Sequence, residues 1–214
     1  MNLDKFSQSL KNRFQKPLPG IEAQKKMWSR RRDLSQLENY DAATVRRAGV
    51  LLMLYPHQNM IYTALMRRPE SPYAHSGQIS FPGGREEDLD GGDLIQTALR
   101  EANEEFGFDT SMVDVVGKLT DMYVSVSDIA VSPTVGVLKE RPIFYPDPVE
   151  VAEIIEVPLS HLIDEGNHKR KKIMSGRGFS LEVPYYDVFG HVLWGATAMM
   201  MSEFLEVYES IDFK

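Results

Sequence analysis

"REANEEFGF", Arg100 to Phe108, places three glutamates within two turns of a predicted helix and then reaches a glycine. The helix is predicted from about Leu94 to Phe106, because apolar residues recur there every three or four positions. Asp93 with Gln96 resembles a capping box at its start, and Gly107 stands where a helix end favours a left-handed residue. Strand-like segments on both sides of this helix predict an α/β domain.

Glu101, Glu104 and Glu105 are predicted to crowd one side of this helix, opposite its apolar stripe. Like charges at this spacing repel, and each carboxylate near the negative end of the helix dipole costs about 0.3–1 kcal/mol. One interpretation is a solvated acidic helix end in which Arg100 pairs with Glu104. The other is a site for Mg²⁺ or Mn²⁺, which prefer oxygen ligands of this kind. A bound cation gives the crowding a physical reason, so we favour it.

Short apolar runs elsewhere predict the strands of a sheet. Residues 48–55 and 60–68 flank the turn sequence "PHQN" and predict a hairpin. Further strands are expected at 79–81, 115–119, 122–127 and 129–138, with a turn at Pro82-Gly83-Gly84. We expect a strand end leading into a short helix over 157–165, a strand or hairpin over 185–197, and a closing helix over 197–211.

The chain is interpreted as residues 1–45, an N-terminal helical extension, and residues 46–214, the main domain. The extension is polar, turns at Pro17–Gly20 and contains three consecutive arginines at Arg30–Arg32. This basic run is predicted to be a solvated face, and "HKRKK" at residues 168–172 a solvated loop. Apolar residues 199–205 are expected to fill the core.

Composition excludes several classes of protein. The net charge of −7 argues against a sequence-independent nucleic-acid binder, whose affinity comes from many contacts of Lys and Arg with phosphates. The absence of cysteine excludes disulfides, thiol nucleophiles and cysteine-bound zinc. No apolar run is long enough to span a membrane, and the N-terminal residues lack a secretory signal pattern, so we expect a cytoplasmic protein. No Gly-x-Ser-x-Gly or Walker sequence is present.

Residues 100–108 resemble the closing half of the Nudix hydrolase motif, in which Arg-Glu, an apolar residue, any residue, Glu-Glu, any residue, Gly and an apolar residue follow one another. The upstream half departs from the family pattern, since the family's Glu falls on Gly92 and its Gly on Glu86. The loop is therefore longer than usual, and the missing carboxylate has substitutes nearby, at Glu87, Asp88 or Asp90. The resemblance implies an α/β/α sandwich around a mixed sheet.

A narrower resemblance is to the coenzyme A pyrophosphatase branch of that family. Its extra signature is an Arg, a His seven positions later, then Gly, Gln and Phe-Pro-Gly-Gly, and this chain has "RPESPYAHSGQISFPGG" with Arg68 and His75 at that separation. Residues 147–162 and 191–201 are similar to the same branch. The resemblance covers about residues 47–201 and implies cleavage of coenzyme A or its thioesters to 3′,5′-ADP and the 4′-phosphopantetheine half.

The resemblance also implies roles for single residues. A metal-activated water would attack one phosphorus, with Glu101 and Glu105 as direct ligands of Mg²⁺ or Mn²⁺ and Glu104 as a further ligand. Arg100 would hold the carboxylates in place by charge-assisted hydrogen bonds. Gly83 and Gly84 would let the backbone approach the metal and phosphates. The general base would be Glu101 or a carboxylate from a later segment, at Glu150, Glu153 or Glu156.

Arg68 is the leading candidate for contact with a substrate phosphate, and His75 would position its loop or contact the pyrophosphate. The alternative is that both residues only tie the loop to the sheet. Another Nudix specificity, such as ADP-ribose, a dinucleotide or a nucleoside triphosphate, also stays open, as does a non-catalytic nucleotide-binding regulatory module. The expected partner is a small-molecule nucleotide, with neither nucleic acid nor membrane, and a homodimer is a candidate assembly.

Overall fold

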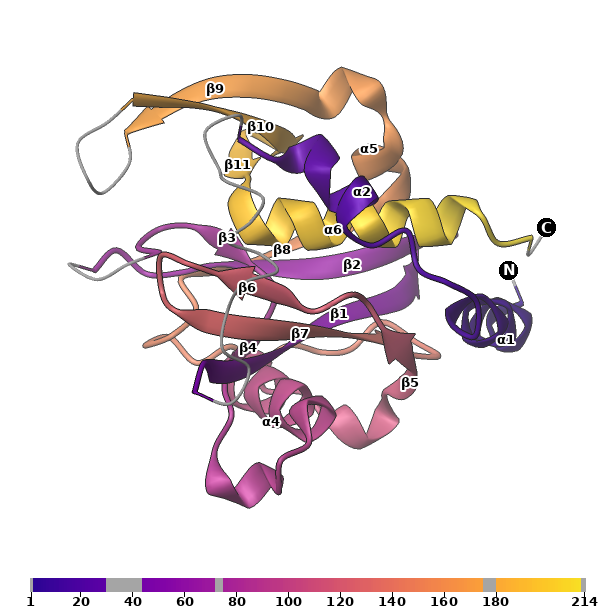
Figure 1. Cartoon of the computed structure of the whole chain (residues 1–214). Helices are drawn as coiled ribbons and strands as arrows, with labels where there is room; N and C mark the ends of the chain where they lie inside the picture. The colour runs from indigo at the N-terminus through magenta and orange to yellow at the C-terminus, as the bar shows by residue number, and fades with distance from the viewer. Residues whose placement is uncertain (1, 30–43, 72–74, 175–179, 213–214) are drawn as a thin grey trace.

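The computed structural model describes residues 2–29, 44–71, 75–174 and 180–212 (Figure 1). The arginine run at Arg30–Arg32 and residues 72–74 of the upstream signature lie outside these described residues. Within them, no helix is both long and apolar enough to cross a membrane.

A mixed sheet of eight strands forms the centre of the part of the chain that is described. Its strands are β1 (Arg46–His57), β2 (Met60–Arg67), β3 (Ile79–Ser80), β4 (Gly83–Arg85), β5 (Asp114–Lys118), β6 (Met122–Val124), β7 (Ile129–Val137) and β8 (Glu153–Pro158). β1 is parallel to β7 and antiparallel to β2 and β4, so both kinds of pairing meet at β1.

β1 is apolar along almost its whole length because both of its faces are buried. Leu51 and Met53 belong to the cluster that contains α4 (Leu94–Phe106), whereas Leu52 and Leu54 belong to the cluster that contains α6 (Gly195–Glu209). Figure 1 shows the sheet between these two helices. The expected α/β/α sandwich around a mixed sheet is therefore confirmed.

A second sheet of three strands lies on the side of α6 away from the main sheet (Figure 1). It comprises β9 (His168–Met174), β10 (Ser180–Val188) and β11 (His191–Leu193), and α5 (Leu159–Ile163) and a 3₁₀ turn, η4 (Glu165–Asn167), lead into it. The prediction of a loop at residues 168–172 was wrong, because this segment is strand β9 and pairs with β10. Its charged side chains are tolerated because β9 is an edge strand.

The N-terminal residues form α1 (Leu3–Phe14), α2 (Ile21–Gln24) and a 3₁₀ turn, η1 (Lys25–Met27). Phe6 and Leu10 are fully buried and belong to the same core cluster as α6. The described part of the extension, residues 2–29, is thus largely helical and packs against the core. A domain boundary at residue 45 stays a prediction.

Local signals predicted the helices better than the short strands. Helix α4 spans the predicted residues, with Asp93 capping its start and Gly107 in the left-handed conformation at its end. The hairpin of β1 and β2 is confirmed, although its turn is shorter and centres on Gln58 and Asn59. The strand expected at 122–127 ends at Val124. Short 3₁₀ turns, η2 (Asp88–Asp90) and η3 (Thr110–Met112), precede and follow α4.

Candidate active site

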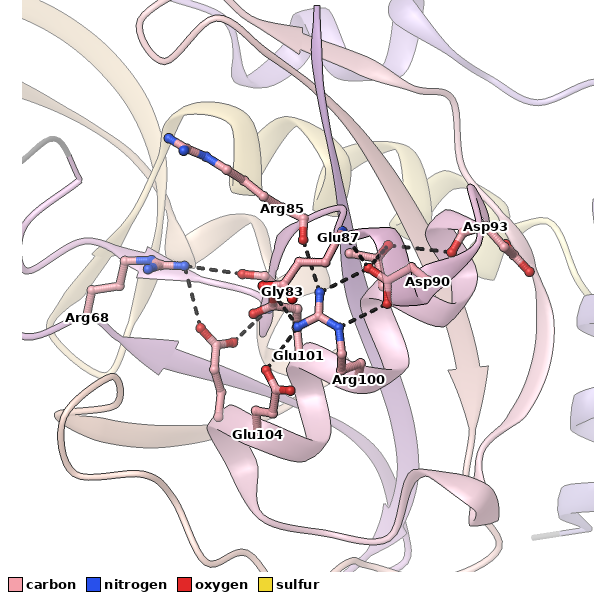
Figure 2. Close-up of polar contacts among 11 residues, drawn as sticks. Arg68, Gly83, Arg85, Glu87, Asp90, Asp93, Arg100, Glu101 and Glu104 are labelled. Carbon is pink, nitrogen blue, oxygen red and sulfur yellow. Dashed lines mark hydrogen bonds and ion pairs between the residues drawn. The ribbon is translucent and has the colours of Figure 1, made fainter.

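Arg100 donates hydrogen bonds to two carboxylates of α4, those of Glu101 and Glu104. Its Nη1 donates to Glu101 Oε1 at 2.9 Å and to Glu104 Oε2 at 3.0 Å (Figure 2). The Arg100 side chain is 14% exposed, and so is that of Glu101. Burial raises the pKa of Glu101 above its ordinary value, although Arg100 opposes that rise. The two carboxylates are thus held together by a shared cation.

Asp90 fixes the other side of Arg100. Its carboxylate accepts hydrogen bonds from Arg100 Nε at 2.9 Å and Arg100 Nη2 at 3.1 Å, and also from the Thr97 hydroxyl and the backbone N–H of Glu87. The hydrogen bond from Arg100 lowers the pKa of Asp90 to about 2. Asp90 is the one upstream carboxylate, of the three that the sequence offered, that pairs with Arg100. Asp90 lies two residues before Gly92, the position on which the family's Glu falls.

Glu105 points inward, which corrects the prediction that all three glutamates lie opposite the apolar stripe. The residue is 2% exposed, and its Oε2 accepts the backbone N–H of Gly83 at 2.7 Å. Burial raises the pKa of this carboxyl to about 8, although the nearby Arg68 lowers it. The helical spacing could not reveal this burial, because β4 covers the helix at this point.

Glycines let β4 approach the helix so closely. A Cβ atom at Gly84 would lie 2.4 Å from the carboxylate of Glu101, and one at Gly49 of β1 would lie 2.3 Å from the carbonyl oxygen of Leu94. Gly83 and Gly84 lie in strand β4 and not in the predicted turn, since they pair with Val50 and Gly49. Gly49 therefore makes room for the backbone of α4, and Gly84 makes room for the carboxylate of Glu101.

Arg68 enters the site from the end of β2. Its Nη2 lies 3.7 Å from Glu105 Oε1 and 3.4 Å from the carbonyl oxygen of Gly83 (Figure 2). His75 has a positive φ of 68°, and its Nδ1 lies 3.0 Å from Gln78 Oε1. Arg68 thus pairs with one helix carboxylate, that of Glu105, whereas the contact found for His75 is within its own loop.

The segment between β7 and β8 brings a further carboxylate towards the site. The backbone N–H of Asp147 donates to the carbonyl oxygen of Glu105 at 3.0 Å, and Glu150 raises the pKa of both Glu101 and Glu105 by charge repulsion. The other two candidates from this later part of the chain are engaged elsewhere. Glu153 pairs with Arg67, and Glu156 accepts from Tyr55 and from Nε and Nη2 of Arg141.

A family model described as the NUDIX domain matches residues 45–175, the part of the chain that carries this site. The chain belongs to the Nudix family. Proteins described as uncharacterized Nudix hydrolase NudL, from Yersinia pestis (strain Pestoides F) and Yersinia pseudotuberculosis (strain IP 31758), are 35% identical to it over 166 residues. These residues make up 76% of this chain and 80% of each relative. This Nudix protein is thus a pyrophosphohydrolase, and Nudix hydrolases in general bind small-molecule substrates of the nucleotide type.

Solved structures with a similar fold include the NUDIX domain of Shewanella oneidensis NrtR in complex with ADP ribose, with a TM-score of 0.46, 15% identity and coverage of 59% of this chain and 82% of that one. The Nudix hydrolase RenU of M. smegmatis has a TM-score of 0.49 and 16% identity, covering 76% of this chain and 86% of its own.

Nudix hydrolases generally use divalent metal ions, and the donor atoms of this site suit such an ion. All three glutamates offer hard oxygen ligands, and one oxygen of Glu101 and one of Glu104 accept no hydrogen bond from the described residues. Within those residues, however, no three His, Asp or Glu side chains converge as a ready metal site. Arg100 binds Glu101 and Glu104, whereas Glu105 accepts from the backbone of β4. The chemistry of the donors therefore fits, and the side chains would have to move to share one ion.

A separate hollow of about 300 Å³ lies between η1, α6, β9 and β10. Its described lining includes Lys26, Lys169 and Arg170, which pair with Glu206, Asp187 and Glu182 respectively. Because its cations are already neutralised and its lining includes no residue of α4 or β4, this hollow does not compete with the carboxylate site as the active site.

Proposed function

We propose that this Nudix hydrolase cleaves the pyrophosphate bond of coenzyme A or its thioesters, giving 3′,5′-ADP and 4′-phosphopantetheine or its acyl derivative. The observation that carries the proposal is the contact of Arg68, the first residue of the upstream signature, with Gly83 and Glu105. The contact supports a link between the signature loop and the hydrolytic helix.

Glu101 and Glu105 are proposed as direct ligands of Mg²⁺ or Mn²⁺, with Glu104 as a further ligand. When bound, the cation would activate the attacking water and neutralise charge on the phosphate oxygens. Arg100, held by Asp90, keeps Glu101 and Glu104 oriented. Gly84 lets the strand lie against the carboxylate of Glu101, and the backbone N–H of Gly83 donates to Glu105.

Glu150 is proposed as the general base, since the other two later candidates are paired with arginines. Its segment is tied to α4 by the hydrogen bond from the backbone N–H of Asp147 to the carbonyl oxygen of Glu105 at 3.0 Å. A carboxylate there would take the proton of the attacking water. Arg68 stays the candidate for contact with the substrate pyrophosphate, with its side chain 37% exposed at the entrance to the site. His75 would position the loop that follows it.

A substrate comparison tests the proposal. Coenzyme A, an acyl thioester of it, ADP-ribose, a dinucleoside polyphosphate and a nucleoside triphosphate would be incubated with the protein and with Mg²⁺ or Mn²⁺, and the products separated by chromatography. We expect the highest kcat/KM for coenzyme A or the thioester, with 3′,5′-ADP as a product. A higher kcat/KM for ADP-ribose would refute the coenzyme A assignment and leave the Nudix hydrolase assignment intact.

A further inference from the structure

A nucleotide that carries a phosphate outside its pyrophosphate needs a second cation in the site. The pyrophosphate itself would face Glu101, Glu104 and Glu105, whose charges a divalent cation balances when bound. A further phosphate lies beyond the reach of that cation and has to be recognised by the chain. An arginine that is not already neutralised is best suited to this task, because its planar guanidinium binds phosphate oxygens in pairs.

Most arginines around the site already have a carboxylate partner. The described pairs are Arg47 with Glu86, Arg67 with Glu153, Arg68 with Glu105, and Arg100 with Asp90, Glu101 and Glu104. Arg85 differs from them. Among the residues that the structure describes, no carboxylate lies within the 4.0 Å ion-pair distance of its guanidinium, and the residue is exposed. Its charge is therefore available to a ligand.

The backbone of Arg85 is fixed in the site, whereas its side chain is not held by any described carboxylate. Its carbonyl oxygen accepts from Arg100 Nη2 at 3.1 Å, and the residue pairs with Ala48 at the end of β4. Gly84, one position earlier, lies against Glu101. In Figure 2 the Arg85 side chain extends to the side of the site from which Arg68 enters, away from Asp90 and Asp93.

Arg68 and Arg85 are spaced to hold two different anionic groups. The guanidinium of Arg68 is 3.4 Å from the carbonyl oxygen of Gly83, and Arg85 follows Gly83 by two residues, which is about 6–7 Å along a strand. Arg68 is paired with a buried carboxylate, so moving it to an outer phosphate would leave Glu105 without its cation. Arg85 has no such constraint.

We propose that Arg85 is a specificity-determining residue that binds the phosphate lying outside the scissile pyrophosphate. This inference rests on the proposed function, in which that group is the 3′-phosphate of coenzyme A. Arg68 then serves the pyrophosphate side of the site. Removal of Arg85 weakens binding of the substrate that carries the extra phosphate and leaves binding of its dephosphorylated form unaffected.

The kinetic test compares coenzyme A with 3′-dephospho-coenzyme A for the wild type, Arg85→Ala, Arg85→Lys and a control, Arg170→Ala. The control removes one exposed positive charge from β9, in the other sheet. In Arg85→Ala we expect kcat/KM for coenzyme A to fall roughly 10- to 100-fold, with less than about a twofold change for the dephospho form. Arg85→Lys should retain part of the preference for coenzyme A over its dephospho form. Equal losses on both substrates, or no loss on either, overturn the proposal.

A binding test separates this proposal from the proposed function. Calorimetry would compare 3′,5′-ADP with 5′-AMP, neither of which contains a pyrophosphate that can be cleaved. We expect the wild type to bind 3′,5′-ADP about tenfold or more tightly than 5′-AMP, and Arg85→Ala to bind the two alike. Equal affinity in the wild type overturns the role of Arg85 even if coenzyme A is cleaved. Selective binding without cleavage of coenzyme A refutes the proposed function alone.

Discussion

Glu105 is the residue at which stability and function conflict most directly. Its carboxylate is almost fully buried, and a guanidinium at 3.7 Å and one backbone N–H only partly compensate for the lost hydration. A buried carboxylate kept under such conditions is typical of a group whose charge is needed in the working state.

We therefore expect Glu105→Gln to lower turnover on the order of 100-fold or more, because it removes a ligand charge while keeping the shape of the side chain. The same change should leave the free energy of unfolding of the metal-free protein nearly unchanged at neutral pH, since a carboxyl with a pKa of about 8 is mostly uncharged there. Steady-state kinetics and urea unfolding would be measured with Glu140→Gln as an exposed control. A folded Glu105→Gln protein with nearly normal turnover would remove Glu105 from the metal site.

The lowered pKa of Asp90 predicts that the free energy of unfolding depends on pH. The pKa of about 2 in the folded protein lies below the ordinary value of 3.8, so the folded state favours the charged form. The stabilisation is present above about pH 4 and is lost as the pH falls towards 2. For a side chain that is 1% exposed it amounts to about 2 kcal/mol.

The gap in unfolding free energy between the wild type and Asp90→Asn should thus be widest above about pH 5 and narrow by about 2 kcal/mol towards pH 2. Denaturant unfolding at a series of pH values would measure it, with the exposed Asp121→Asn as a control. If the difference in unfolding free energy between the wild type and Asp90→Asn is the same at every pH, the charge of Asp90 does not contribute and only its shape does.

At the scale of elements, the end of α4 and the loop after β7 depend on one glycine. Gly107 has a φ of +66°, and a Cβ atom there would lie 2.1 Å from the carbonyl oxygen of Tyr145. The same loop carries Glu150, and its Phe144 packs against Phe106. The helix end therefore helps to position the proposed base.

Gly107→Ala should lower the free energy of unfolding by about 2 kcal/mol or more and reduce kcat, because the backbone strain adds to a clash with a main-chain atom. Gly195→Ala is a matched control, since Gly195 has a φ of +68° and a Cβ atom there would meet nothing within 4 Å. Gly195→Ala should lower the free energy of unfolding by about 1 kcal/mol, the cost of the backbone strain alone, and leave kcat unchanged. Thermal unfolding and steady-state kinetics would be measured for both variants. Equal effects of the two substitutions would argue against a role of the loop in positioning Glu150.

The elements also show what the sequence could predict. Helix α4 was predicted to the residue because its apolar period, Asp93 cap and Gly107 end are all local signals. The burial of Glu105 and the strand at residues 168–174 could not be predicted, since each depends on a partner, β4 or β10, that comes from elsewhere in the chain. Asp90 was a candidate from its spacing, but only the fold distinguished it from Glu87 and Asp88. Arg85 carried no sequence signal except its position after the two glycines.

At the scale of the whole molecule, the main sheet separates the side that carries the candidate active site from the side that joins the N-terminal helices. The α4 side carries the carboxylates, whereas the α6 side joins the N-terminal helices to the core (Figure 1). Glu203 of α6 lies where the N-terminal helices meet the core. It is fully buried and accepts hydrogen bonds from Gln24 Nε2 at 2.8 Å, and from the hydroxyl and backbone N–H of Thr120 at 2.7 and 3.2 Å.

Glu203→Ala should lower the free energy of unfolding by about 2–4 kcal/mol, because one buried donor of Gln24 and two part-buried donors of Thr120 lose their acceptor. For a chain of this length each kcal/mol corresponds to roughly 2–4 °C in Tm, so a fall of several degrees is expected. The kcat at about 20 °C should stay within about twofold of the wild type, since the sheet lies between Glu203 and α4. Glu206→Ala, which removes a solvent-accessible partner of Lys26 from the same helix, should cost less than about 1 kcal/mol. If the two variants unfold at the same temperature, the buried carboxylate does not hold the N-terminal helices on the core; if Glu203→Ala alone loses kcat, the two sides of the sheet are coupled.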